Sequence, residues 1–161
     1  MPLFVLLLVL LSPPAPPEAK CYAPPVTGVV TKLFVQPACP YCSGHRGLEY
    51  ATTRGSGVRA VAQGVVSFVG PVVGILYVVV DQSDGLLATY GMLQSANVHR
   101  GDQIVAGQVI AATTVTFYFG LRRDGVYIDP FPFLGVRRVR PRLVPVDGTM
   151  PRPPRVQPLT C

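Results

Sequence analysis

The chain has 161 residues, 49% of them hydrophobic and 14% charged, as is typical of one folded domain with a sizeable core. This composition argues against disorder over most of the chain, and the 16 Gly and 18 Pro follow no Gly-X-Y period, which excludes collagen. The net charge of +6 is concentrated at the C-terminal end, because residues 136–161 hold six Arg and one acidic residue. The rest of the chain is nearly neutral, so we expect no nucleic-acid partner.

The N-terminal segment has the pattern of an export signal. Its apolar run of about ten residues, between Met1 and Ser12, is too short to span a bilayer but matches the hydrophobic region of a signal peptide. A cluster of prolines follows and argues against a buried helix. We therefore predict a signal peptide over residues 1–19, a Pro-rich segment over 20–40, and export to the cell envelope or the extracellular space.

Four cysteines follow this segment: Cys21, Cys39, Cys42 and Cys161. An even count in an exported chain predicts disulfides, with the pairing left open. Cys39-Pro40-Tyr41-Cys42 also matches the redox motif of glutaredoxins, which works because its first thiol begins a helix. Here a turn-forming run, residues 43–47, comes next, so we expect a structural bridge or free thiols rather than redox catalysis.

The region from residue 58 to residue 134 is a succession of strand patterns. Runs of β-branched, aromatic and apolar residues alternate with turns such as Ser83-Asp84-Gly85 and Asp124-Gly125, and no window shows a helical period. The expected strands are 64–70, 75–80, 86–90, 103–105, 108–110, 115–121 and 126–128. The sequence thus predicts an all-β, small antiparallel β-sandwich or barrel-sandwich-like domain over 41–135, with a basic Pro/Arg-rich C-terminal tail over 136–161.

Two stretches carry chemical information beyond the fold. His45-Arg46-Gly47-Leu48-Glu49 places an imidazole and a carboxylate four residues apart, and residues 98–110 alternate turn glycines with apolar residues. Together with residues 57–66, 89–90, 119–122 and 127–130, and in this order, they resemble the lysostaphin/LytM-type zinc metallopeptidases, which cut peptide cross-links in bacterial cell walls. The resemblance runs from about residue 41 to residue 134.

The resemblance implies a zinc site of two His and one Asp, with further His assisting catalysis. His45 falls on the first ligand, and Glu49 replaces the Asp. The HxH pair falls on Thr116-Phe117-Tyr118, and the His of the YxHL segment falls on Met92. We therefore expect His45 and Glu49 as a residual metal pair, degenerate catalytic positions at Met92, Thr116 and Tyr118, and a groove lined by these three together with Tyr90. His99 is expected in a solvated turn.

The leading hypothesis is an exported, non-catalytic member of this family that binds peptidoglycan or regulates a cell-wall hydrolase, without a cofactor. The basic tail would add attraction to anionic envelope polymers or lipids. The alternative is an active zinc endopeptidase with an altered site that uses His45 and Glu49. A lipoyl or biotinyl carrier domain shares the barrel-sandwich pattern but needs an acceptor Lys within it, and Lys20 and Lys32 both precede the strand-rich region.

Overall fold

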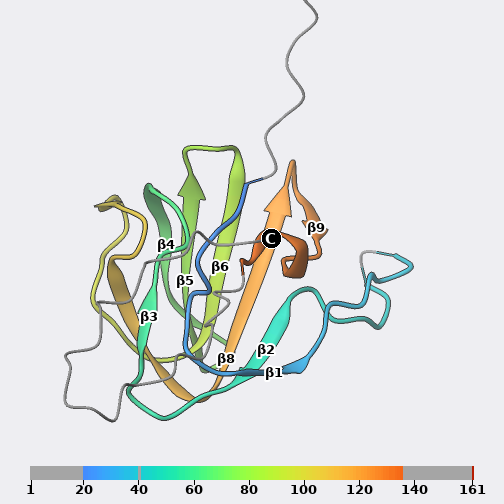
Figure 1. Ribbon diagram of the computed structural model, residues 1–161, viewed down its shortest axis with the longest axis horizontal. Helices are drawn as coiled ribbons and strands as arrows, with labels where there is room; N and C mark the ends of the chain where they lie inside the picture. Colours follow the sequence, from blue (N-terminus) through green and yellow to red (C-terminus); the bar gives the residue numbers. More distant parts are fainter. Residues whose placement is uncertain (1–19, 40, 136–160) are drawn as a thin grey trace, which may run out of the picture.

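The computed structural model describes residues 20–39, 41–135 and 161 (Figure 1). The predicted signal peptide and almost all of the predicted basic tail lie outside these residues. Within the described ranges, no helix is long and apolar enough to cross a membrane.

The described residues form nine strands and one short 3₁₀ helix, which confirms the predicted all-β class. Every pairing between these strands is antiparallel. In chain order the elements are β1 (Val29–Lys32), β2 (Leu48–Ala51), β3 (Gly57–Arg59), β4 (Gly64–Val72), β5 (Ile75–Gln82), β6 (Leu86–Ala96), β7 (Gln103–Ile104), β8 (Val109–Arg123), β9 (Val126–Ile128) and η1 (Phe131–Phe133).

The sheet is organised around β8, which crosses the centre of the molecule in Figure 1. The strand order is β1-β2-β8-β6-β5-β4-β7, and β3 and β9 also pair with β8. One edge of β8 pairs along its length with β6, while the other edge pairs in turn with β3, β2 and β9. This arrangement sets the segment before β2 beside the middle of the longest strand.

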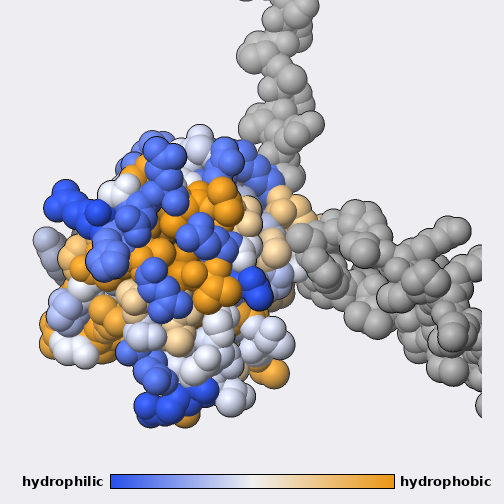
Figure 2. All heavy atoms as spheres, turned by 90° about the vertical axis from the view of Figure 1, so that its left-hand side faces the viewer, coloured by the Kyte–Doolittle hydropathy of each residue, from blue (hydrophilic) through white to orange (hydrophobic). Residues whose placement is uncertain are grey.

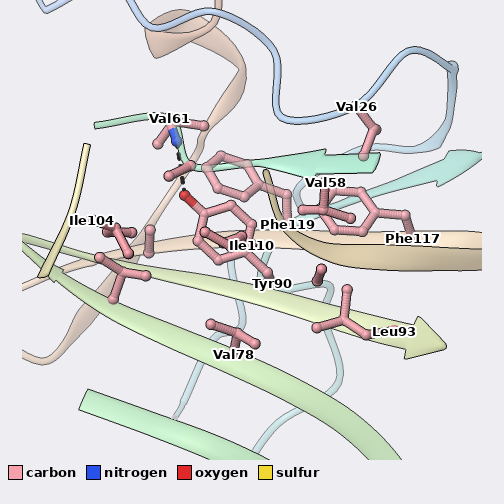
Figure 3. Close-up of a cluster of buried hydrophobic side chains, with 14 of the residues drawn as sticks. Val26, Val58, Val61, Val78, Tyr90, Leu93, Ile104, Ile110, Phe117 and Phe119 are labelled. Atoms are coloured by element: carbon pink, nitrogen blue, oxygen red, sulfur yellow. Dashed lines mark hydrogen bonds between the residues drawn. The ribbon is translucent and has the colours of Figure 1, made fainter. Parts of the chain in front are cut away.

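The hydrophobic core lies on the inner face of the sheet. Alternate residues of β8 point inward, among them Phe117 and Phe119, and both are fully buried against Tyr90 of β6 (Figure 3). The Tyr90 hydroxyl accepts a hydrogen bond of 3.0 Å from the Val61 amide, so this polar group is satisfied inside the core. The core depends on the inward-facing residues alone, because successive side chains of a strand point to opposite faces.

Two disulfides connect the described cysteines, as the even count predicted. Cys21 bonds to Cys161 across 140 residues of sequence, whereas Cys39 bonds to Cys42 within the loop between β1 and β2. Beside the first disulfide, the buried Tyr22 forms a bridge with Leu134, and its hydroxyl donates to Asp84. The N-terminal segment is thereby fastened to the end of the domain.

The surface on the β3 and β4 side mixes apolar and hydrophilic side chains (Figure 2). β4 exposes three large apolar side chains, those of Val65, Phe68 and Val72. In Figure 2 hydrophilic side chains surround and interrupt the apolar area, as is usual for a surface in contact with water.

Candidate functional site

The residues of interest meet on the outer face of the sheet, where β2, β8 and β6 lie side by side. Tyr118 of β8 is paired with Glu49 of β2 on one side and with Gly91 of β6 on the other. Residues that are directly paired across strands point to the same face. We use the term outer face for the side of the sheet that carries Glu49 and Tyr118, opposite the core.

His45 lies at the edge of this face, in the loop that leads into β2. Its backbone exchanges two hydrogen bonds with Val35, of 2.8 and 2.9 Å, which fold the loop back on itself. The ring is buried, with 8% of the residue exposed. Its Nδ1 lies 2.8 Å from the Leu33 carbonyl oxygen, and its Nε2 lies 3.0 Å from Oε1 of Glu49.

Both ring nitrogens of His45 are therefore occupied. The Leu33 carbonyl can only accept a hydrogen bond, so Nδ1 carries a hydrogen and donates it. On the other side of the ring, Oε1 of Glu49 lies 3.0 Å from Nε2 of His45 and 3.6 Å from the Lys32 ammonium. These contacts of the ring tie the loop to β2.

Tyr118 covers the outer face beside this pair. Its hydroxyl donates to the Arg46 carbonyl oxygen at 2.8 Å, and its ring meets the His45 ring edge-on, with centroids 6.0 Å apart. Glycines leave room for it: a Cβ at Gly47 would lie 2.8 Å from the Tyr118 ring, and one at Gly120 would lie 2.6 Å from its hydroxyl oxygen. The ring therefore occupies the space around the position at which the family resemblance implied the second His of the HxH pair.

The electrostatic surroundings of Tyr118 keep its hydroxyl protonated. Burial raises its pKa far above the ordinary value, and the neighbouring Tyr127 and Tyr77 act in the same direction. The guanidinium groups of Arg122 and Arg46 lower the pKa by less than the burial raises it. A neutral phenol that already donates its hydrogen bond is a poor zinc ligand.

The remaining predicted site residues are spread over both faces. Thr116 is exposed and lies two residues from Tyr118 on β8. Met92 is half-buried at a bulge of β6, with a positive φ of 58° that is uncommon for a residue other than glycine. The prediction that Tyr90 lines the groove was wrong, because Tyr90 is fully buried and points into the core rather than to the outer face (Figure 3). His99 is exposed in a turn, as expected.

The donor set does not fit the zinc site that the family resemblance implied. Structural and catalytic zinc sites use at least three protein ligands of His, Cys, Asp or Glu type. Within the described part of the chain, no group of three or more such side chains could hold a metal ion. The two that remain, His45 and Glu49, are bound to each other, so a metal would have to displace their hydrogen bonds.

The structure adds residues that the motif comparison did not single out. Arg46 and Arg122 both approach the ring of Tyr127, with Cζ 5.8 and 5.3 Å from its centroid. An open pocket of about 370 Å³ lies next to them, and Arg46, Tyr127 and Cys39 are part of its lining. Arg46 follows His45 directly, so the sequence motif could have indicated it. Arg122 and Tyr127 are brought together only through the pairing of β8 with β9.

An antiparallel sheet with a His-Arg-Gly-Leu-Glu segment beside its central strand defines a metallopeptidase-like domain of the LytM type. The model of peptidase family M23 matches residues 43–130, which is more than half of the chain. The chain therefore belongs to peptidase family M23.

Relatives and solved structures agree with this assignment. The chain is 36% identical over 98 residues to the murein hydrolase activator EnvC of Escherichia coli K12, over 56% of this chain and 23% of EnvC. It is 26% identical over 136 residues to the lipoprotein YgeR of the same organism, over 79% of this chain and 52% of YgeR. The chain thus spans from about a quarter to about half of these relatives' lengths. Helicobacter pylori Csd3 shares the fold, with a TM-score of 0.65 at 20% identity over 79% of this chain and 38% of Csd3.

Proposed function

We propose that this protein is an exported, non-catalytic member of peptidase family M23 that binds peptidoglycan. The observation that carries the proposal is what occupies the position at which the family resemblance implies a metal. His45 and Glu49 satisfy each other there, and the ring of Tyr118 fills the neighbouring space. A scaffold of this family that has exchanged metal ligands for an aromatic side chain is suited to hold a wall peptide rather than to hydrolyse it.

The binding surface in this proposal is the outer face, with Thr116 and Tyr118 at its centre and Met92 beside them. Aromatic and hydroxyl side chains provide both apolar contact and hydrogen bonding to a peptide. The leader-like segment over residues 1–19 supports export, and the likeness to the lipoprotein YgeR agrees with a place in the envelope. The arginines of residues 136–161 would add attraction to anionic envelope polymers or lipids.

A second role, the regulation of a cell-wall hydrolase, is favoured by one observation. The relative that is 36% identical over 98 residues is a murein hydrolase activator. A domain that binds the wall and also contacts a hydrolase would bring that enzyme to its substrate. The test is to add the purified protein to a wall hydrolase and measure the release of muropeptides from sacculi.

Sedimentation with purified sacculi tests the main proposal. The full chain, with its disulfides oxidised, is expected to pellet with sacculi. Tyr118→Ala should weaken this binding, whereas the matched control Tyr41→Ala, at a residue that is 98% exposed on the β1–β2 loop, should not. Failure of the wild-type chain to sediment would refute peptidoglycan binding.

Incubation of sacculi with the protein and zinc tests the enzymatic alternative. No release of peptide fragments is expected, with an active M23 endopeptidase as the positive control. Zinc-dependent release that His45→Ala abolishes would establish the altered-site endopeptidase instead.

A further inference from the structure

Two guanidinium groups meet at one aromatic ring on the outer face. Arg122 of β8 is paired with Tyr127 of β9, and its Cζ lies 5.3 Å from the centroid of that ring. Arg46, from the segment before β2, places its Cζ 5.8 Å from the same centroid. Nη2 of Arg46 also donates to the Cys42 carbonyl oxygen at 3.4 Å, and cation–π contacts hold both guanidinium groups in place.

Arg122 has hydrogen-bonding capacity that the described residues do not use. Its Nε is buried and has no hydrogen-bond partner among them. No carboxylate of the described ranges forms an ion pair with it either. Buried donors are nearly always paired, so the unpaired Nε of Arg122 indicates a missing acceptor.

The surroundings favour a small organic anion. The pocket of about 370 Å³, with Arg46 and Tyr127 in its lining, has the size of a site for a few peptide residues. Tyr77 and Tyr127 each lie close enough to Tyr118 to influence its ionisation, and these rings offer apolar contact next to the positive charge. The planar fork of a guanidinium matches a carboxylate.

We propose that Arg122 and Arg46, held at the ring of Tyr127, bind the free carboxylate at the end of a peptidoglycan stem peptide. This inference rests on the proposed function and specifies which part of the wall is recognised. The two guanidinium groups supply the positive charge for the carboxylate. The neighbouring tyrosines contact the preceding residues of the peptide.

The test compares a stem tetrapeptide that has a free C-terminal carboxylate with the same peptide as its carboxamide. Calorimetric titration uses the full chain with both disulfides oxidised. The wild type should bind the acid at least about tenfold more tightly than the amide, because a charge-assisted hydrogen bond is lost in the amide. Arg122→Gln should remove this preference, and Arg54→Gln, at an exposed arginine between β2 and β3, should keep it.

Each outcome decides the proposal. Equal affinity of the wild type for acid and amide overturns it, and this comparison needs no variant. An unchanged preference in a folded Arg122→Gln chain also overturns it. If neither peptide binds while sacculi still sediment with the protein, the carboxylate site is wrong and the proposed function stands. If sacculi do not bind either, both fail. The arginines of residues 136–161 are present in every chain compared, so they do not account for a difference between variants.

Discussion

The hydrogen bond between His45 and Glu49 provides the sharpest test that these residues serve the fold rather than a metal. Glu49→Gln keeps the length of the side chain and one acceptor oxygen, but it removes the negative charge. The His45 ring would still donate to the Leu33 carbonyl, at 2.8 Å in the wild type. Its Nε2, which lies 3.0 Å from a carboxylate oxygen in the wild type, would face a neutral amide instead.

The size of the effect follows from the geometry. A hydrogen bond to a charged group contributes about 1.5–3 kcal/mol, and a neutral one about 0.5–1.5 kcal/mol. The Glu49 side chain is 23% exposed, so solvent screening places the contribution of this hydrogen bond toward the lower end of the range for a charged group. We expect Glu49→Gln to reduce the free energy of unfolding by about 1 kcal/mol, and Tm by about 3–4 °C.

Urea unfolding followed by circular dichroism is the suitable assay, since the chain has no Trp. A double-mutant cycle with His45→Gln should give a coupling energy of about 1 kcal/mol between the two positions. Lys32→Gln is the control, because that ammonium is 57% exposed and should change stability by less than about 0.5 kcal/mol. Additive effects of the two variants, together with a zinc-induced rise in Tm that either variant abolishes, would refute the structural role and identify a metal pair.

Four further predictions concern the core and the polar contacts. Tyr90→Phe leaves the buried Val61 amide unpaired and should cost about 1–3 kcal/mol in urea unfolding. Burial raises the pKa of Tyr50 to about 12, so the protonated phenol contributes to the free energy of unfolding in full only below about pH 10. By pH 11 this contribution should have fallen by about 1.4 kcal/mol, and Tyr50→Phe should abolish the fall. Burial tends to raise the pKa of Asp84, but its hydrogen bonds from Tyr22, the Leu86 amide and Lys20 hold it below the ordinary value. The stability from Asp84 is thus present above about pH 4 and lost in more acidic solution, a loss absent from Asp84→Asn. Gly91→Ala would press a methyl group against the Tyr77 and Tyr118 rings and should cost about 1–3 kcal/mol.

The strand pattern of the sequence was sufficient for the fold class, but not for the full length of the strands. The expected strands 75–80 and 86–90 begin where β5 and β6 begin, because turn residues with Gly precede or follow each run. The expected strand 115–121 and all but the first residue of the expected strand 108–110 belong to one strand, β8. The two Ala residues between them have weak strand preference, and their place is set by pairing with β3 and β6.

The candidate site was predictable only where its residues are close in sequence. The spacing of His45 and Glu49 placed an imidazole next to a carboxylate, and the structure brings them into contact. The direction of Tyr90 was not evident, because motif position says nothing about which face of a strand a side chain occupies. The meeting of Arg46 with Arg122 depends on how β2 and β9 follow one another along β8, which no local pattern encodes.

The division of β8 into two faces explains how this chain keeps the family fold with other residues at the positions of the family's HxH pair. Phe117 and Phe119 hold the core from the inner face, while Thr116 and Tyr118 occupy the positions of the HxH pair on the other. Changes on the outer face therefore leave the core contacts intact. Tyr118 is accommodated because neighbouring glycines give its ring space, and its hydroxyl is satisfied by the Arg46 carbonyl.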